Sequence, residues 1–163
     1  MIIVSDTTPI ISFIKINKLD LLHQLFDEVL IPDAVFRELT ANKLFTDEAE
    51  IVRNTKFLKT ISVKNRQSLE ILQAVSGLDD GESEAIVLAN EQKSDALIID
   101  ERKGRKVAQK LGITVTGSIG ILIQANNEKL ISKDDVKSCI DILKNCNIRL
   151  SDNLIQEALD MLE

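Results

Sequence analysis

The sequence predicts an α/β fold with a mainly parallel central sheet. Two observations favour it: short apolar segments alternate with segments whose apolar residues recur at helical spacing, and no linker-like, repeated or low-complexity segment interrupts this alternation. A chain of 163 residues is also long enough to bury a real core as one unit. We therefore expect a single domain over 1–163, with a core over about 1–130 and a helical extension over about 131–163.

The first half of the chain begins with a predicted strand at 2–4, whose Ile-Ile-Val run is typical of a strand buried on both faces. Thr7 or Thr8 is expected to cap the following helix, because Pro9 suits its first position. Short apolar runs predict two further strands, at 28–32 and 57–63. Apolar residues at helical spacing predict helices at 19–26, 33–40, 47–55 and 68–75.

The second half follows a break in the pattern at Gly77–Gly81. Gly112 is a natural end for a helix, because glycine readily adopts the conformation that closes one. Predicted helices lie at 81–92, 104–112, 117–125, 133–144 and 151–162, and predicted strands at 96–99 and 113–115.

Composition restricts the possible functions. The formal net charge is −6, so binding to nucleic acid would need a local basic patch or bound cations. Five Phe and no Trp or Tyr argue against base stacking on aromatic platforms. No apolar run is long enough to span a bilayer and no signal peptide is evident, so we expect a cytoplasmic protein without membrane contact.

The cysteines and the histidine offer no familiar metal site. Cys139 and Cys146 are expected two helical turns apart, too far for a disulfide, and are interpreted as free thiols in a reducing compartment. His23 is the only histidine, which excludes the usual Cys/His zinc sites. We expect it on a helix surface.

Four carboxylates are placed where they could share a site. Asp6 and Asp100 each follow a predicted parallel strand, so both are expected at the same edge of the sheet. Glu38 and Glu82 lie on predicted helices that could close around them. Converging carboxylates repel one another and tend to protonate, whereas Mg²⁺ or Mn²⁺ relieves the repulsion and favours oxygen ligands. Taken singly, each acid also fits an ordinary structural role, Asp6 as a cap or turn residue, Glu38 on a solvated helix face, and Glu82 at a helix N-terminus.

Four blocks of the sequence, in this order, resemble the PIN-domain superfamily: SDTTPIISFIKINKLDLLHQLF, VLIPDAVFREL, LDDGESEAIVLA and ALIIDERKGRKVAQKLGITVTGSIGIL. The resemblance runs from Met1 to about Leu130 and is greatest to a branch of small prokaryotic proteins predicted to bind nucleic acid, relatives of VapC-like toxins. It implies a three-layer α/β/α fold and a ribonuclease dependent on Mg²⁺ or Mn²⁺. Many relatives are toxins with an antitoxin partner, and homodimers are common among them.

The resemblance also implies a site, with four acids matching the family's catalytic and metal-binding positions: Asp6, Glu38, Glu82 and Asp100. Two positions depart from the common pattern. Many relatives have Asp where this chain has Glu82, and often Thr or Ser where it has Ile99. Glu84 or Asp79 could substitute for Glu82, and Glu101 could assist Asp100.

Polar and basic residues near these acids are candidates for substrate binding. Thr7 and Ser118 are expected in the outer shell of the metal. The basic run after Asp100 could hold substrate phosphates, although it also fits a solvated helix face, and its candidate contacts are Arg102, Lys103 and Arg105. The TGSIG segment at 116–120 lacks a phosphate-loop pattern and is interpreted as a helix start. The apolar side chains that follow, at 119 and 121–123, are expected to form core or dimer surface.

Three functions were compared on these grounds. The first is a metal-dependent endoribonuclease that hydrolyses RNA, possibly as the toxin of a toxin–antitoxin pair. The second is a catalytically weak PIN-like module that binds RNA or a protein. The third is a receiver-like domain phosphorylated on Asp6 or Asp100, which ranks last because the chain lacks the order of acids and lysine that a receiver needs.

Overall fold

A computed structural model describes residues 1–41, 43, 46–148 and 150–162 of the chain. Within them, five strands form one sheet in the order β3-β2-β1-β4-β5, and every neighbouring pair is parallel. The strands are β1 (Ile3–Ser5), β2 (Val29–Pro32), β3 (Leu58–Ile61), β4 (Ala96–Ile98) and β5 (Val115–Thr116). This arrangement confirms the predicted α/β fold class with its parallel central sheet.

Ten helices are found in the described part of the chain. In the first half these are α1 (Thr7–Lys15), α2 (Asp20–Phe26), α3 (Asp33–Ala41), α4 (Thr46–Asn54) and α5 (Arg66–Ser76). In the second half they are α6 (Asp80–Glu91), α7 (Arg102–Lys110), α8 (Ser118–Asn127), α9 (Lys133–Asn145) and α10 (Asp152–Met161). No described helix is long and apolar enough to cross a membrane.

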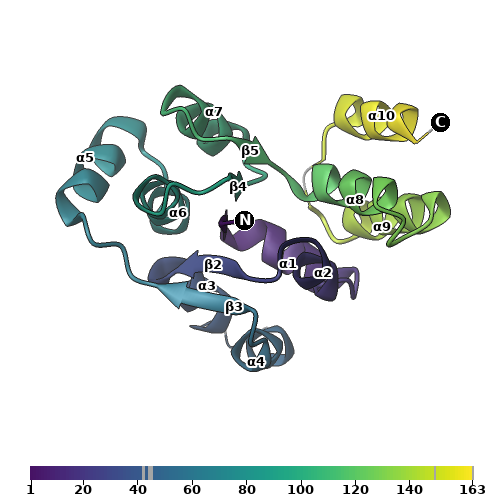
Figure 1. Cartoon of the computed structure of the whole chain (residues 1–163), viewed down its shortest axis with the longest axis horizontal. Coiled ribbons are helices and arrows are strands. Elements are labelled where there is room, and N and C mark those ends of the chain that lie inside the picture. Colours follow the sequence, from purple (N-terminus) through teal and green to yellow (C-terminus); the bar gives the residue numbers. More distant parts are fainter. Residues whose placement is uncertain (42, 44–45, 149, 163) are drawn as a thin grey trace.

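The helices form a layer on each side of the sheet (Figure 1), because the central strands are apolar on both faces. Successive strand side chains point to opposite faces, so Ile3 joins one buried cluster and Val4 the other. Ile98 likewise packs with the cluster of α1, α2 and α8, whereas Leu97 packs with the cluster of α5, α6 and α7. The two clusters give the three-layer α/β/α architecture.

The C-terminal helices belong to the first of these clusters. Buried side chains of α9 and α10, such as Val136 and Ile155, pack in the same cluster as Phe13 of α1 and Leu122 of α8. The apolar side chains at 119 and 121–123 are all buried, so of the two roles expected for them the structure favours core. The predicted extension at 131–163 also includes Arg149 and Glu163, which lie outside the described residues.

Strand register brings the residues after β1 and β4 to one edge of the sheet. Val4 pairs with Leu97 and Ser5 with Ile98. The backbone N–H of Asp6 donates to the carbonyl of Ile98, at 2.9 Å, which continues the pairing by one residue. The acids that follow these strands therefore lie at the carboxyl edge, where open parallel sheets bind their ligands.

Most predicted elements are found, with ends displaced by a few residues, but the cap of the first helix was predicted wrongly. Asp6 occupies the N-cap position of α1, whereas Thr7 and Thr8 are its first two helical residues. The Thr7 hydroxyl donates instead to Glu38, a long-range partner that local sequence patterns do not reveal.

The cysteines are free, and His23 is exposed and stacks on Phe57 with ring centroids 5.1 Å apart.

Candidate active site

Asp6 is the most deeply buried of the three acids whose charges interact at the carboxyl edge. Its position directly after β1 leaves it only 4% exposed. Burial raises the pKa of its carboxyl group to about 7, and the nearby charges of Glu82, Asp79 and Glu38 add to the increase. A hydrogen bond from the backbone N–H of Thr7 acts in the opposite direction. Around neutral pH, Asp6 is therefore poised between its charged and neutral forms.

Glu38 reaches the same region from α3, where two protein donors fix its carboxylate. One oxygen accepts a hydrogen bond from the Thr7 hydroxyl, and the other accepts one from the backbone N–H of Gly81, at 3.1 Å. A Cβ atom at position 81 would lie 2.6 Å from Oε1 of Glu38, so any larger residue there would displace this carboxylate. Burial raises the pKa of Glu38, although the Thr7 hydrogen bond lowers it.

Glu82 combines a structural role with a place beside the other acids. It forms a capping box with Asp79: the Glu82 N–H donates to Asp79 Oδ1 at 2.8 Å, and the Asp79 N–H donates to Glu82 Oε2 at 3.2 Å. Burial raises the pKa of Glu82, and the charges of Asp79, Glu101 and Glu38 raise it further. The helix-terminal role expected for Glu82 is thus present together with its interaction with the acidic group.

Asp100 lies at the same edge but has a different set of partners. Ser118 donates to both of its oxygens, through the backbone N–H at 2.7 Å and the hydroxyl at 2.6 Å. Burial raises the pKa of Asp100, whereas the two Ser118 hydrogen bonds and the charge of Arg105 lower it. Arg105 is held there by donating to the Ile99 carbonyl, at 2.8 Å. The charge on Asp100 is therefore partly balanced by the protein itself.

The site thus consists of two neighbouring parts. Asp6, Glu38 and Glu82 form an acidic group whose members are coupled by their charges, and Asp100 pairs with Ser118 and Arg105. Within the residues that the structure describes, no three His, Cys, Asp or Glu side chains are arranged so that they could hold a metal ion directly.

The chemistry of the four acids nevertheless fits Mg²⁺ or Mn²⁺. All four offer hard carboxylate oxygens, the ligands that these ions prefer. Each oxygen carries two lone pairs, so hydrogen bonds from Thr7, Gly81 and Ser118 leave acceptor capacity for a cation. Burial raises the pKa of Asp6, Glu38 and Glu82, and repulsion from neighbouring acids adds to the increase; a divalent cation would favour their charged forms.

Glu84, a possible substitute for Glu82, and Glu101, a possible assistant to Asp100, are both occupied by other partners. Glu84 accepts a hydrogen bond from the Ala34 N–H at 2.8 Å, and its second oxygen faces the guanidinium groups of Arg37 and Arg66. It stabilises the N-terminus of α3 and is occupied in that role. Glu101 caps α7 by accepting from two backbone N–H groups. Asp79, the other possible substitute, lies near the acidic group, and its charge therefore contributes to the raised pKa of Asp6.

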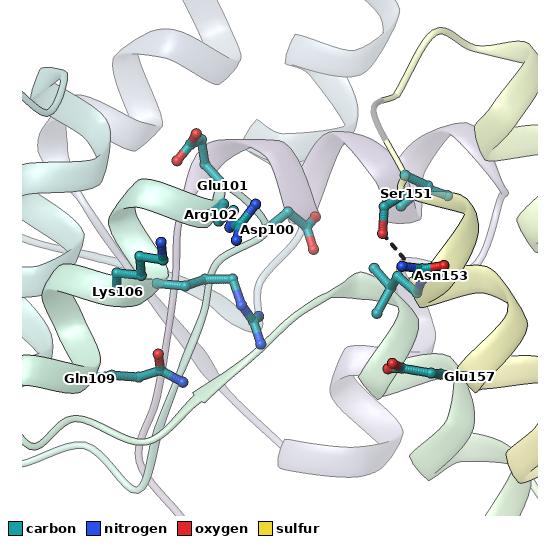
Figure 2. Close-up of a pocket in the computed structure, with 11 residues that line it drawn as sticks. Asp100, Glu101, Arg102, Lys106, Gln109, Ser151, Asn153 and Glu157 are labelled. Atoms are coloured by element: carbon teal, nitrogen blue, oxygen red, sulfur yellow. Dashed lines mark hydrogen bonds between the residues drawn. The ribbon is translucent and has the colours of Figure 1, made fainter.

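A cleft of about 810 Å³ opens beside Asp100. Figure 2 shows Lys106 and Gln109 projecting from α7 on one side and Asn153 and Glu157 lying on α10 on the other. Two of the three predicted basic contacts, Arg102 and Arg105, line this cleft. Lys103 lies elsewhere, close to the turn at Gly77. The α10 wall was missed from the sequence, because packing between distant segments creates it.

Together, the fold and these acids define a three-layer α/β protein with a carboxylate-rich site at the carboxyl edge of its parallel sheet. A family model described as a PIN domain matches residues 2–163. The chain therefore belongs to the PIN-domain family, and the matched region includes α9 and α10 as well as the core. No curated protein matched the chain. PIN domains are in general nucleases that depend on divalent metals, so membership suggests a nuclease-type function and a nucleic-acid substrate.

Proposed function

We propose that the protein is a metal-dependent endoribonuclease that hydrolyses phosphodiester bonds of RNA. The observation that carries the proposal is the group of charge-coupled acids Asp6, Glu38 and Glu82 at the carboxyl edge of the sheet, beside Asp100. Asp6 and Glu82 are buried, and Glu38 reaches them from an exposed position on α3. A protein seldom buries several like charges without compensation unless the site has a use for them. Family membership supports the nuclease class of this activity.

In this proposal the four acids would hold Mg²⁺ or Mn²⁺, which would supply positive charge at the scissile phosphate and lower the pKa of water. Thr7 and the Gly81 N–H orient Glu38, whereas Ser118 orients Asp100. The guanidinium groups of the two cleft residues, Arg102 and Arg105, bind the substrate phosphates. Such contacts align the RNA backbone with the acids, so that binding energy contributes to positioning.

A catalytically weak binding module is the second candidate. Two observations favour it: the capping box occupies Glu82, and the described residues contain no group of acids arranged to hold an ion directly. Ile99, which is fully buried, also leaves the position before Asp100 without a hydroxyl group. Under this alternative the protein binds RNA or a partner and does not cleave.

A toxin role, an antitoxin partner and a homodimeric state are further parts of the proposal, as is a cytoplasmic location. The first three rest on the resemblance to toxin relatives, and the location rests on the sequence pattern, in which no membrane-spanning run or signal peptide is evident. A small gene adjoining this one, whose product co-purifies with the chain and inhibits cleavage, would support the toxin role. Light scattering at several concentrations would test the homodimer.

The deciding experiment compares metal binding and cleavage in the same samples. Mn²⁺ is titrated by calorimetry into wild type, Asp6→Asn and the control Asp141→Asn, whose side chain is exposed on α9. Labelled RNA is then incubated with each protein and with EDTA. The proposal predicts that Asp6→Asn loses binding and cleavage while the control keeps both. A wild type that binds RNA but neither binds Mn²⁺ nor cleaves would support the binding module instead.

A further inference from the structure

The cleft between α7 and α10 has walls of opposite chemical character, which constrains what it binds. Its volume of about 810 Å³ lies in the range of sites that enclose small ligands or short chain segments. Asp100 lines the cleft, so a chain lying in it reaches this acid directly (Figure 2).

The α7 wall is basic. Its lining side chains recur at positions i, i+3, i+4 and i+7 of the helix and therefore share one face. They are Arg102, Arg105, Lys106 and Gln109. Two carboxylates, Asp100 and Glu101, also line this end of the cleft, so the three cations leave a modest positive excess along α7 in a protein with net charge −6. Positive charge along one helix face is complementary to the charge of a phosphate backbone.

Among the described residues that line the α10 wall, none carries a positive charge. The helix Asp152–Met161 contains no Lys or Arg, and Glu157 presents a carboxylate to the cleft. This charge repels phosphates and favours placing them on the α7 side. Beside it, Leu154 is 42% exposed and offers apolar surface to a base. Asn153 carries both a donor and an acceptor, the groups that pair with base edges.

We infer that this cleft binds a single-stranded RNA segment next to the scissile bond, with its phosphates on α7 and its bases against α10. The inference rests on the proposed function, because that function places the cleavage site at the four acids, of which Asp100 lines the cleft. Only a single strand presents unpaired base edges to a side wall. Since the chain has no Trp or Tyr, hydrogen bonds and apolar contact from α10 replace aromatic stacking. Asn153 and Glu157 therefore set the base preference.

The role of the α7 wall in holding phosphates is tested by measuring RNA binding rather than cleavage. Labelled 2′-O-methyl RNA oligonucleotides are titrated in EDTA and followed by fluorescence anisotropy at several salt concentrations. Lys106→Glu is expected to weaken binding of every sequence by about tenfold and to reduce the log–log salt slope by about 0.7. Lys110→Glu makes the same charge change on α7 outside the lining of the cleft and should weaken binding by less than about twofold. Equal losses in the two variants would overturn the assignment of the α7 wall.

The role of the α10 wall in base preference is tested by measuring the affinities of four homopolymer oligonucleotides. Asn153→Ala and Glu157→Gln should change the ratio of the strongest to the weakest affinity by about threefold or more. The control is Gln156→Ala, also on α10 but outside the lining of the cleft. Unchanged ratios in both cleft variants, or tighter binding of duplex than of single strand, would overturn the inference. Failure of the nuclease proposal looks different from failure of this inference. In that case wild type would bind the oligonucleotides with this selectivity but leave unmodified RNA intact.

Discussion

Replacing Asp6 by Asn should make the protein more stable at alkaline pH while it removes a proposed metal ligand. Burial raises the pKa of this carboxyl from its ordinary 3.8 to about 7 in the folded state. Between these values the folded state holds a proton that the unfolded state has lost, so the free energy of unfolding falls as pH rises. The slope is about 1.4 kcal/mol per pH unit between roughly pH 4 and pH 7, and it vanishes above pH 7. An Asn side chain does not titrate and still accepts the Thr7 N–H hydrogen bond.

Between about pH 5 and pH 8, the free energy of unfolding of Asp6→Asn should therefore rise relative to wild type by about 2–3 kcal/mol. Urea denaturation in EDTA at both pH values measures this difference directly. The control Asp141→Asn changes an exposed carboxylate on α9 and should show no comparable effect. If Asp6→Asn and wild type lose stability in parallel over this range, then Asp6 does not carry the uncompensated charge on which the reasoning depends.

Three further predictions concern the groups around the acids. Ser118→Ala removes a hydroxyl donor to Asp100, so it should raise the pKa of that carboxyl further and cost about 1–3 kcal/mol by thermal denaturation at neutral pH; an unchanged melting temperature would contradict this. Gly81→Ala places a Cβ 2.6 Å from Oε1 of Glu38, and calorimetry should show Mn²⁺ affinity reduced by about 10–100-fold with the circular dichroism spectrum preserved. Mg²⁺ at about 100 times its Kd should stabilise wild type by about 2.7 kcal/mol at pH 8 but leave Asp6→Asn almost unaffected; equal stabilisation of both would place the ion elsewhere.

The sequence predicted those parts of the site that depend on local pattern and on the geometry of parallel strands. Asp6 and Asp100 lie at one edge because each follows a buried strand, and strand register leaves little freedom there. The division of the site into two parts could not be predicted. It depends on which side chains reach Asp100, and Arg105 does so only because packing directs it toward the Ile99 carbonyl.

Long-range contacts also explain the other differences. The hydroxyl of Thr7 would cap its own helix in isolation, but in the folded protein it donates to Glu38 on α3. Glu84 and Glu82 are two residues apart on α6 and look equivalent in sequence. Helical geometry turns them to different sides, so that Glu84 meets the N-terminus of α3 instead of the acidic group. Sequence patterns identify such candidates, whereas tertiary packing selects among them.

Helix N-termini explain how the site holds several acids near one another with few opposite charges nearby. Asp6 accepts from Thr7 at the start of α1, Glu38 from Gly81 at the start of α6, and Asp100 from Ser118 at the start of α8. Each backbone N–H carries part of the positive end of its helix dipole, which offsets some negative charge without a neutralising side chain. A lysine or arginine in the same places would satisfy the carboxylates fully and compete with a cation. Partial compensation keeps the acids folded into place and leaves their remaining charge available for a divalent ion.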